Sequence, residues 1–179
     1  MRILFVVFLA LLGLAFRLDW IGDHPDNFTP IISIVIFSSF YIKSRFSFLL
    51  PLLVIAISDF FIGYGSFTTM FSVYSCYILI YLLGKYLLVE NFSRAIQISF
   101  IGSILFFVIT NFAVWLNCIL YNIPYYTHDL SGLINCYLAG IPFFKNTLIS
   151  TLSFSAYFYI LYRFDFNYNS VYNTSKTLS

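Results

Sequence analysis

The chain has 179 residues, of which 61% are hydrophobic, 22% are aromatic and only 9% are charged. A soluble domain usually has about 25% charged and about 45–50% apolar residues, so an ordinary soluble domain is excluded, as are a disordered chain and a disulfide scaffold. The net charge is +2, and no basic run supports a nucleic-acid partner. An integral membrane protein remains, and at about 20 residues per span the length allows five or six spans.

The first half begins with two apolar segments joined by a polar loop. Residues 1–18 predict an uncleaved helix, because no small-residue cleavage site follows them. The loop at 19–29 holds three Asp and one His. Thr29 and Pro30 predict a helix start, since Thr can accept from free amides and Pro fits the first helical position. The second span, 27–42, is short, so it either crosses fully or is re-entrant.

The remaining apolar segments complete an all-α bundle of about six transmembrane helices. The last apolar stretch is longer than one span needs, and Pro142 is expected to divide it, because proline ends or kinks a helix. The polar tail is expected to lie loosely in the cytoplasm. The predicted elements are spans at 46–63, 70–89, 95–117 and 142–162, a short helical segment at 132–140, a single transmembrane domain over 1–163, and a tail at 164–179.

The positions of the charges predict the orientation. If the N-terminus is inside, seven of the nine basic residues fall on the cytoplasmic side, and the outer loops contain Asp but no Lys or Arg. This is the positive-inside pattern, and it agrees with an even number of spans and with both termini in the cytoplasm. The seven are Arg2, Lys43, Arg45, Lys85, Arg94, Arg163 and Lys176.

Two charged residues fall at membrane depth, Asp59 and Lys145. A charge at mid-helix costs about 2.5–3.5 kcal/mol on insertion scales, so such residues face the bundle or a cavity. Both lie toward the outer ends of their spans, which invites pairing. Either they form a structural ion pair or reach the outer interface, or one or both contact a ligand or coupling ion.

Uncharged polar residues at depth also gather in the outer half. Asn111 and Trp115 are four residues apart and share a helix face. Each residue taken alone has a structural interpretation, since Asn often links membrane helices and Trp often anchors at the interface. Their joint clustering predicts a cavity that opens outward. The candidate ligand-binding residues are Asp59, Asn111, Trp115, Lys145, Asn146, Asn27 and Thr29.

Other chemistries lack support in the sequence. No nucleophile elbow, Walker motif, paired catalytic carboxylates or zinc-protease motif occurs, so we expect no enzyme, no cofactor and no metal. A two-His metal site at His24 and His128 is a weak alternative. The cysteines have no metal spacing, and we expect free buried thiols, although a bridge between Cys118 and Cys136 stays open.

Specific segments of the chain resemble an uncharacterised bacterial family of small, multi-span membrane proteins described as transport proteins. The resemblance covers about residues 20–160 and implies a multi-pass protein of the bacterial inner membrane, without a known substrate. The segments are 27–31 (NFTPI), 51–59 (PLLVIAISD), 110–116 (TNFAVWL) and 132–147, which includes AGIPFFKNT.

The architecture is also similar to the substrate-binding S components of energy-coupling factor transporters. That similarity implies six helices, an outward pocket for a vitamin or metal ion, and closure by the loop between the first two helices, here 19–29. It also implies transporter coupling subunits as partners. The first segment departs from the pattern, because Ala10, Gly13 and Ala15 do not give small residues at a clean four-residue spacing.

Three hypotheses follow. The first is a small-molecule uptake protein, the substrate-binding membrane subunit of a transporter. Lys145 would meet a carboxylate or phosphate, which favours an anionic ligand, and Asp59 would either orient Lys145 or bind an amine. The second is a structural or assembly membrane protein without a ligand. The third is a membrane enzyme acting on a lipid.

Overall fold

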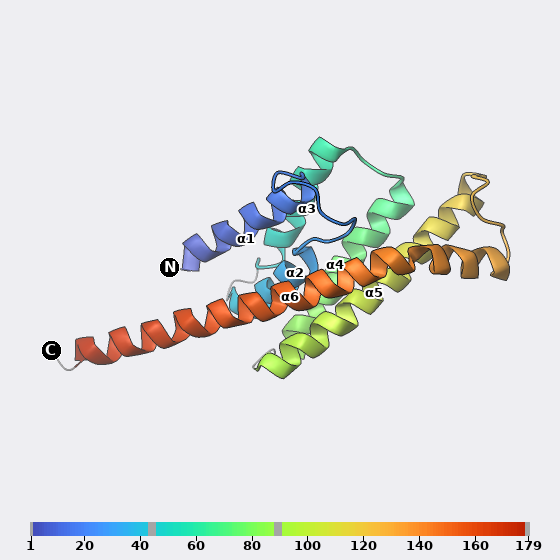
Figure 1. Cartoon of the computed structure of the whole chain (residues 1–179). Helices are drawn as coiled ribbons and strands as arrows, with labels where there is room; N and C mark the ends of the chain where they lie inside the picture. The colour runs from blue at the N-terminus through green and yellow to red at the C-terminus, as the bar shows by residue number, and fades with distance from the viewer. Residues whose placement is uncertain (1, 43–45, 88–90, 178–179) are drawn as a thin grey trace.

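The computed structural model describes residues 2–42, 46–87 and 91–177, with side chains described for 4–42, 46–87 and 91–164. Over these residues the chain is all helical, with six helices and no strand (Figure 1). The all-α class and the number of helices agree with the prediction, whereas Lys43 and Arg45 lie outside the described residues. The helices are α1 Arg2–Arg17, α2 Ile31–Tyr41, α3 Leu49–Ile62, α4 Phe67–Tyr86, α5 Phe92–Leu120 and α6 Leu130–Thr177.

Helix α2 is the centre of the bundle. Every residue of α2 except Phe40 is buried, and α2 contacts each of the other five helices. Its sequence, IISIVIFSSFY, is apolar or small on every side. A helix without a polar face is stable only when other elements surround it, and α2 therefore fixes where the other helices lie.

The interior of the bundle contains a chain of serine hydroxyls. Ser99 Oγ donates to Ser155 Oγ at 2.7 Å, Ser155 Oγ donates to Ser33 Oγ at 3.0 Å, and Ser33 Oγ donates to the Thr151 carbonyl at 2.8 Å. All four residues are fully buried. These bonds tie α5, α6 and α2 together. Hydrogen bonds between helices are also common in membranes, where the hydrophobic effect does little to drive helices together.

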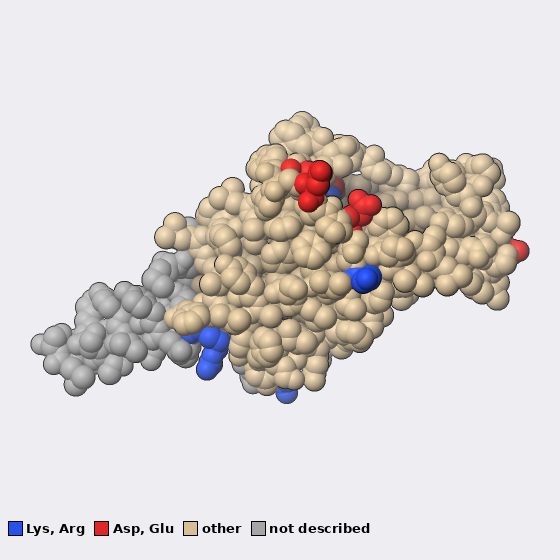
Figure 2. Space-filling view, viewed as in Figure 1, with Lys and Arg blue, Asp and Glu red and all other residues tan. Residues whose placement is uncertain are grey.

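The helices differ in whether they are long and apolar enough to cross a membrane. Among the described residues, α4 and α5 are the helices both long and apolar enough to cross a membrane, and Leu4–Arg17, α2 and α3 are shorter apolar helices. The apolar windows of α4 and α5 are only 33% and 22% buried. Most residues of these windows are therefore at least partly exposed, and uncharged surface covers most of the face shown in Figure 2.

Two local predictions are wrong. Thr29 does not cap α2. Pro30 is the N-cap residue, and no side chain makes a capping hydrogen bond at this end of the helix. Instead the Thr29 amide donates to the Asn27 carbonyl at 3.0 Å in a tight turn. Pro142 does not divide the last apolar stretch, because it lies inside α6.

Helix α6 is continuous and changes direction early in its course (Figure 1). Proline removes one helical hydrogen bond and pushes away the carbonyl four residues back, which bends a helix without ending it when neighbours hold both halves. Here α5 packs along α6. The helix also continues to Thr177, through the predicted loose tail at 164–179.

The buried position of α2 gives a stability prediction. We expect Phe37→Ala to lower the free energy of unfolding by about 3 kcal/mol, because removing a fully buried ring leaves a cavity where Phe37 is 0% exposed. The control is Phe71→Ala on the outer face of α4, where the ring is 64% exposed. Thermal unfolding in detergent measures both, and equal losses would contradict a central role for α2.

Candidate functional site

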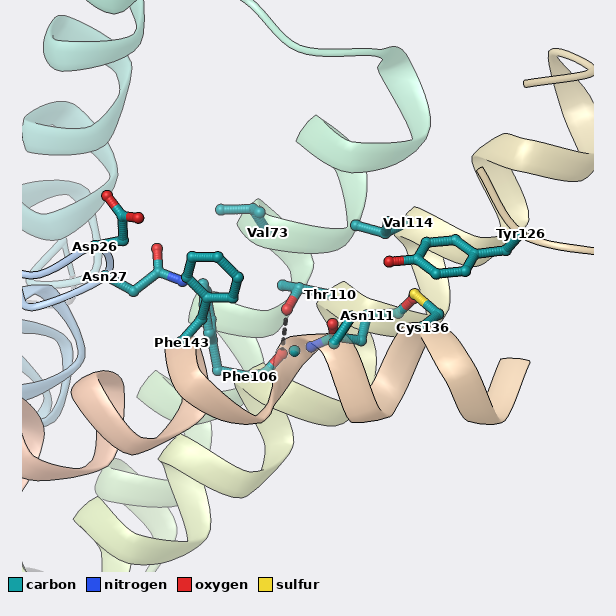
Figure 3. Close-up of a pocket in the computed structure, with 12 residues that line it drawn as sticks. Asp26, Asn27, Val73, Phe106, Thr110, Asn111, Val114, Tyr126, Cys136 and Phe143 are labelled. Atoms are coloured by element: carbon teal, nitrogen blue, oxygen red, sulfur yellow. Dashed lines mark hydrogen bonds between the residues drawn. The ribbon is translucent and has the colours of Figure 1, made fainter. Parts of the chain in front are cut away.

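The larger cavity lies between α4, α5 and α6, beneath two loops. It has a volume of about 550 Å³, within the usual range for small-molecule sites of about 300–1,000 Å³. The loop at 18–30 and the loop at 121–129 each contribute to its wall (Figure 3). The lining residues are Asp26, Asn27, Val73, Phe106, Thr110, Asn111, Val114, Tyr126, Cys136, Ala139, Gly140 and Phe143.

Three polar side chains in this wall have spare hydrogen-bonding capacity. Asn111 donates from Nδ2 to the Phe107 carbonyl at 2.8 Å, and its Oδ1 accepts no bond from the described residues. The side-chain amide of Asn27 and the hydroxyl of Tyr126 likewise make no hydrogen bond within the described chain. Figure 3 shows Asn27 and Tyr126 pointing inward from opposite sides of the cavity. Convergent free polar groups within an apolar wall are typical of ligand sites.

The loop at 18–30 is held over the cavity by backbone geometry and by α6. Asn27 adopts φ 62°, a left-handed conformation that Asn tolerates better than most residues. The Asn146 side chain donates from Nδ2 to the Asp26 carbonyl at 3.1 Å. His24 Nε2 lies 2.8 Å from the Phe16 carbonyl and 3.1 Å from Asp19 Oδ1. These contacts join both ends of the loop to helices.

The loop at 121–129 is anchored in the same manner. Trp115 Nε1 donates to the Thr127 carbonyl at 3.1 Å. Asp129 Oδ1 accepts from the hydroxyls of Thr127 and Ser131 and from the Gly132 amide. These bonds, the one from Thr127 foremost, lower the pKa of Asp129 from 3.8 to about 2. The carboxylate therefore caps the start of α6 in its charged form at any pH above about 4.

A smaller cavity of about 260 Å³ adjoins the larger one and shares Asn27, Val73 and Phe106 with it. Its wall includes Arg17 of α1 and Asp59 of α3, which form an ion pair. Arg17 Nη2 donates to Asp59 Oδ1 at 2.5 Å.

Further hydrogen bonds complete this ion pair. Arg17 Nε donates to Ser58 Oγ at 2.5 Å, and Tyr74 of α4 donates its hydroxyl to Asp59 Oδ2 at 2.9 Å. Both carboxylate oxygens of Asp59 therefore have partners. The side chains of Arg17 and Asp59 are only 21% and 9% exposed. The pair links α1, α3 and α4 at one end of the bundle.

The predicted pairing of Asp59 with Lys145 is therefore wrong. Asp59 takes Arg17 as its partner, whereas Lys145 is exposed and lines neither cavity. Arg17 is closer because α1 packs against α3, and its forked guanidinium suits a carboxylate better than an ammonium does.

The other predicted site residues divide into two groups. Asn111 lines the larger cavity, Thr29 lines the smaller one, and Asn27 lines both. Trp115 and Asn146 line neither cavity, and their hydrogen bonds instead hold the two covering loops. The structure thus brings Asn27, Thr29, Asn111 and Asp59 together and leaves Lys145 outside.

The model of a family of unknown function (DUF6580) matches residues 1–170 of the chain. The chain belongs to this family. No curated protein matches the chain, and no solved structure matches it. Membership of the DUF6580 family agrees with the predicted uncharacterised family, and the similarity to S components stays a prediction.

Two residues that line the cavities of this DUF6580 member, Arg17 and Tyr126, are not among the sequence candidates. Arg17 could have been suspected, because it and Lys145 are the two basic residues that fall outside the predicted cytoplasmic set. Tyr126 could not, because it is one of 15 tyrosines and its position depends on how the loop folds. Burial raises the pKa of its phenol, so Tyr126 faces the cavity as a neutral donor and acceptor.

The described part of this DUF6580 member shows neither a cluster of possible metal ligands nor a disulfide. No group of three His, Cys, Asp or Glu side chains that could hold a metal occurs there. Cys76, Cys118 and Cys136 are free and buried, as expected for structural thiols. Cys136 lies in the wall of the larger cavity, and its Sγ is 3.4 Å from the Asn111 carbonyl.

The ion pair gives a second stability prediction. We expect Asp59→Asn and Arg17→Gln each to lower the free energy of unfolding by about 3 kcal/mol, because each leaves a mostly buried charge without its partner. The exchanged pair, Arg17→Asp with Asp59→Arg, should recover part of the loss. Lys145→Gln is the control and should leave thermal unfolding unchanged, and a loss as large as that of Asp59→Asn would contradict the assignment.

Proposed function

We propose that this DUF6580 member is a multi-pass membrane protein that binds a small molecule in the larger cavity from the outer side of the bacterial inner membrane. The observation that carries the proposal is the cavity of about 550 Å³ into which Asn27, Asn111 and Tyr126 present free polar groups. Two loops contribute to its wall and the cavity stays open on one side, which suits a protein that takes up a ligand from outside.

The distribution of polarity supports the membrane part of the proposal. The helix faces that point outward carry large apolar side chains, such as Phe60, Phe61 and Phe67, each at least 68% exposed. Polar serines occupy the interior instead. A core helix of a soluble protein is mostly buried, unlike α4 and α5. An apolar exterior around a partly polar interior suits lipid as the surrounding medium.

The order of the helices supports an alternating arrangement. Residues that line the two cavities lie toward the ends of α1, α3 and α5 and toward the beginnings of α2, α4 and α6, so successive helices alternate in direction. In this arrangement the loops at 18–30, 63–66 and 121–129 face outward. Helix α2, at 11 residues, is about 16 Å long at 1.5 Å per residue, so it reaches only part of the way through the bilayer.

Transport is the activity that a covered outward cavity favours. The chain has no nucleotide-binding motif, so active uptake would require transporter coupling subunits, as the resemblance to S components implies. The proposal includes no catalytic step. The earlier expectation of an anionic ligand depended on Lys145, which lines neither cavity, and it is not carried forward.

A structural or assembly role without a ligand is the second candidate. The observation that favours it is the complete pairing of Asp59, whose two oxygens bond to Arg17 and Tyr74. Such a pair fixes the positions of α1, α3 and α4 without any ligand. A structural role does not explain why polar side chains of the larger cavity lack hydrogen-bond partners within the described chain.

Mass spectrometry of small molecules that co-purify with the protein in mild detergent tests the proposed function. We expect a compound that is enriched with the wild type and reduced at least tenfold with Asn111→Leu, because losing a buried hydrogen bond to a ligand costs about 1.5 kcal/mol. Lys145→Ala is the control and should keep the compound.

All three proteins must show the same thermal unfolding before the comparison. A folded wild type that carries nothing but lipid would favour the structural role. A compound retained equally by the Asn111→Leu variant would place the ligand elsewhere.

Cysteine accessibility in intact cells tests the orientation. We expect Asp23→Cys, in the loop at 18–30, to react with a membrane-impermeant thiol reagent from outside. Tyr86→Cys, where the native side chain is 74% exposed at the end of α4, should react only after permeabilisation. The parent protein, whose three cysteines are buried, gives the background. The opposite order of labelling would contradict the proposed orientation.

A further inference from the structure

We infer that the ligand of the larger cavity is a small organic cation with a flat apolar body, and this inference rests on the proposed function. Among the described residues, the cavity wall contains one acidic side chain, Asp26, and no Lys or Arg. A cation would therefore meet an opposite charge there, whereas an anion would find none among these lining residues.

The two basic residues at this end of the bundle are not available to an anion. Arg17 lines only the smaller cavity, and its guanidinium already bonds to Asp59 and Ser58. Lys145 lies on the exposed face of α6 and lines neither cavity. An anionic ligand would thus have to pull Arg17 from a mostly buried partner, which is costly.

The Asp26 carboxylate has no such partner. It makes no hydrogen bond or ion pair with the described residues, and only its main-chain carbonyl is engaged, by Asn146. Asp26 is exposed at the edge of the cavity, where a ligand entering from outside would pass it.

The covering loops surround the entrance with negative charge. The loop at 18–30 also holds Asp19 and Asp23, and the loop at 121–129 holds Asp129. Neither loop contains Lys or Arg, and Figure 2 shows acidic side chains gathered at two neighbouring places on this face. Figure 2 also shows basic side chains close to these acidic ones, so the excess of negative charge belongs to the two loops. Such an excess raises the local concentration of ligands of the opposite sign.

The rest of the wall fits a flat cation. The rings of Phe106, Phe143 and Tyr126 line the cavity, and aromatic faces attract ammonium and protonated nitrogen groups. Asn111 Oδ1 is an unpartnered acceptor that can take an N–H from such a ligand, and Asn27 can supply a second carbonyl oxygen. The aromatic rings, the free acceptors and the carboxylate therefore all favour a flat organic cation.

Protection of an engineered cysteine tests the inference. Ala139 lines the cavity and is exposed, so Ala139→Cys should react with N-ethylmaleimide faster than the three buried native cysteines. The probes share one indole ring and differ in charge at pH 7. They are tryptamine, a cation; tryptophol, a neutral alcohol; and indole-3-propionate, an anion. The rate of labelling in detergent is measured by intact mass at increasing probe concentration.

We expect tryptamine to slow labelling at a concentration about tenfold lower than tryptophol does, because tryptamine adds one exposed ion pair and one cation–π contact. We expect indole-3-propionate to protect least. Asp26→Asn in the same background should remove the preference for tryptamine over tryptophol. Asp23→Asn, on the same loop but outside the cavity wall, should keep it.

The outcomes separate the inference from the proposed function. Strongest protection by indole-3-propionate, equal protection by all three probes, or an unchanged preference in Asp26→Asn would each overturn the cationic ligand and leave a binding cavity in place. No protection by any probe would overturn the inference, and co-purification would then decide separately whether the cavity binds anything.

Discussion

The burial of α2 is the constraint on which the rest of the structure depends. An 11-residue helix with no polar face cannot lie at any surface that meets water, and it is too short to cross a bilayer unaided. The five other helices enclose it. Ser155 donates a hydrogen bond to Ser33, and Ser33 donates one to the Thr151 carbonyl, and these two bonds fix α6 against α2. The two cavities lie near the beginning of α2, beside α4, α5 and α6.

The ion pair between Arg17 and Asp59 has a different role from the cavity residues beside it. It joins α1 to α3 and, through Tyr74, to α4, at the end of the bundle where α2 no longer fills the interior. A charge pair at this position is stable because each charged group is matched and hydrogen-bonded. Since both charged groups are satisfied within the chain, the pair needs no ligand to hold α1, α3 and α4 together.

The larger cavity combines rigid and adjustable parts. Asn111, Phe106 and Val114 lie on α5, whose position is set by packing, whereas Asn27 and Tyr126 lie on loops held by few bonds. Trp115 and Asn146 bond to the main chain of those loops, so they position the covering segments rather than touch a ligand. The segments that carry Asn27 and Tyr126 depend on these bonds for their positions.

The sequence by itself determined that the chain is all-helical and where its helices lie, because the apolar segments and the spacing of polar breaks reflect helix length directly. It also located Asn27, Thr29, Asn111 and Asp59 near one end, because depth along a helix can be counted from its residues. It could not choose Arg17 over Lys145 as the partner of Asp59, find Tyr126 in the cavity wall, or show that α6 continues through Pro142. Those depend on which helices pack side by side and how the loops fold back, and only the tertiary structure decides contacts between residues that are distant along the chain.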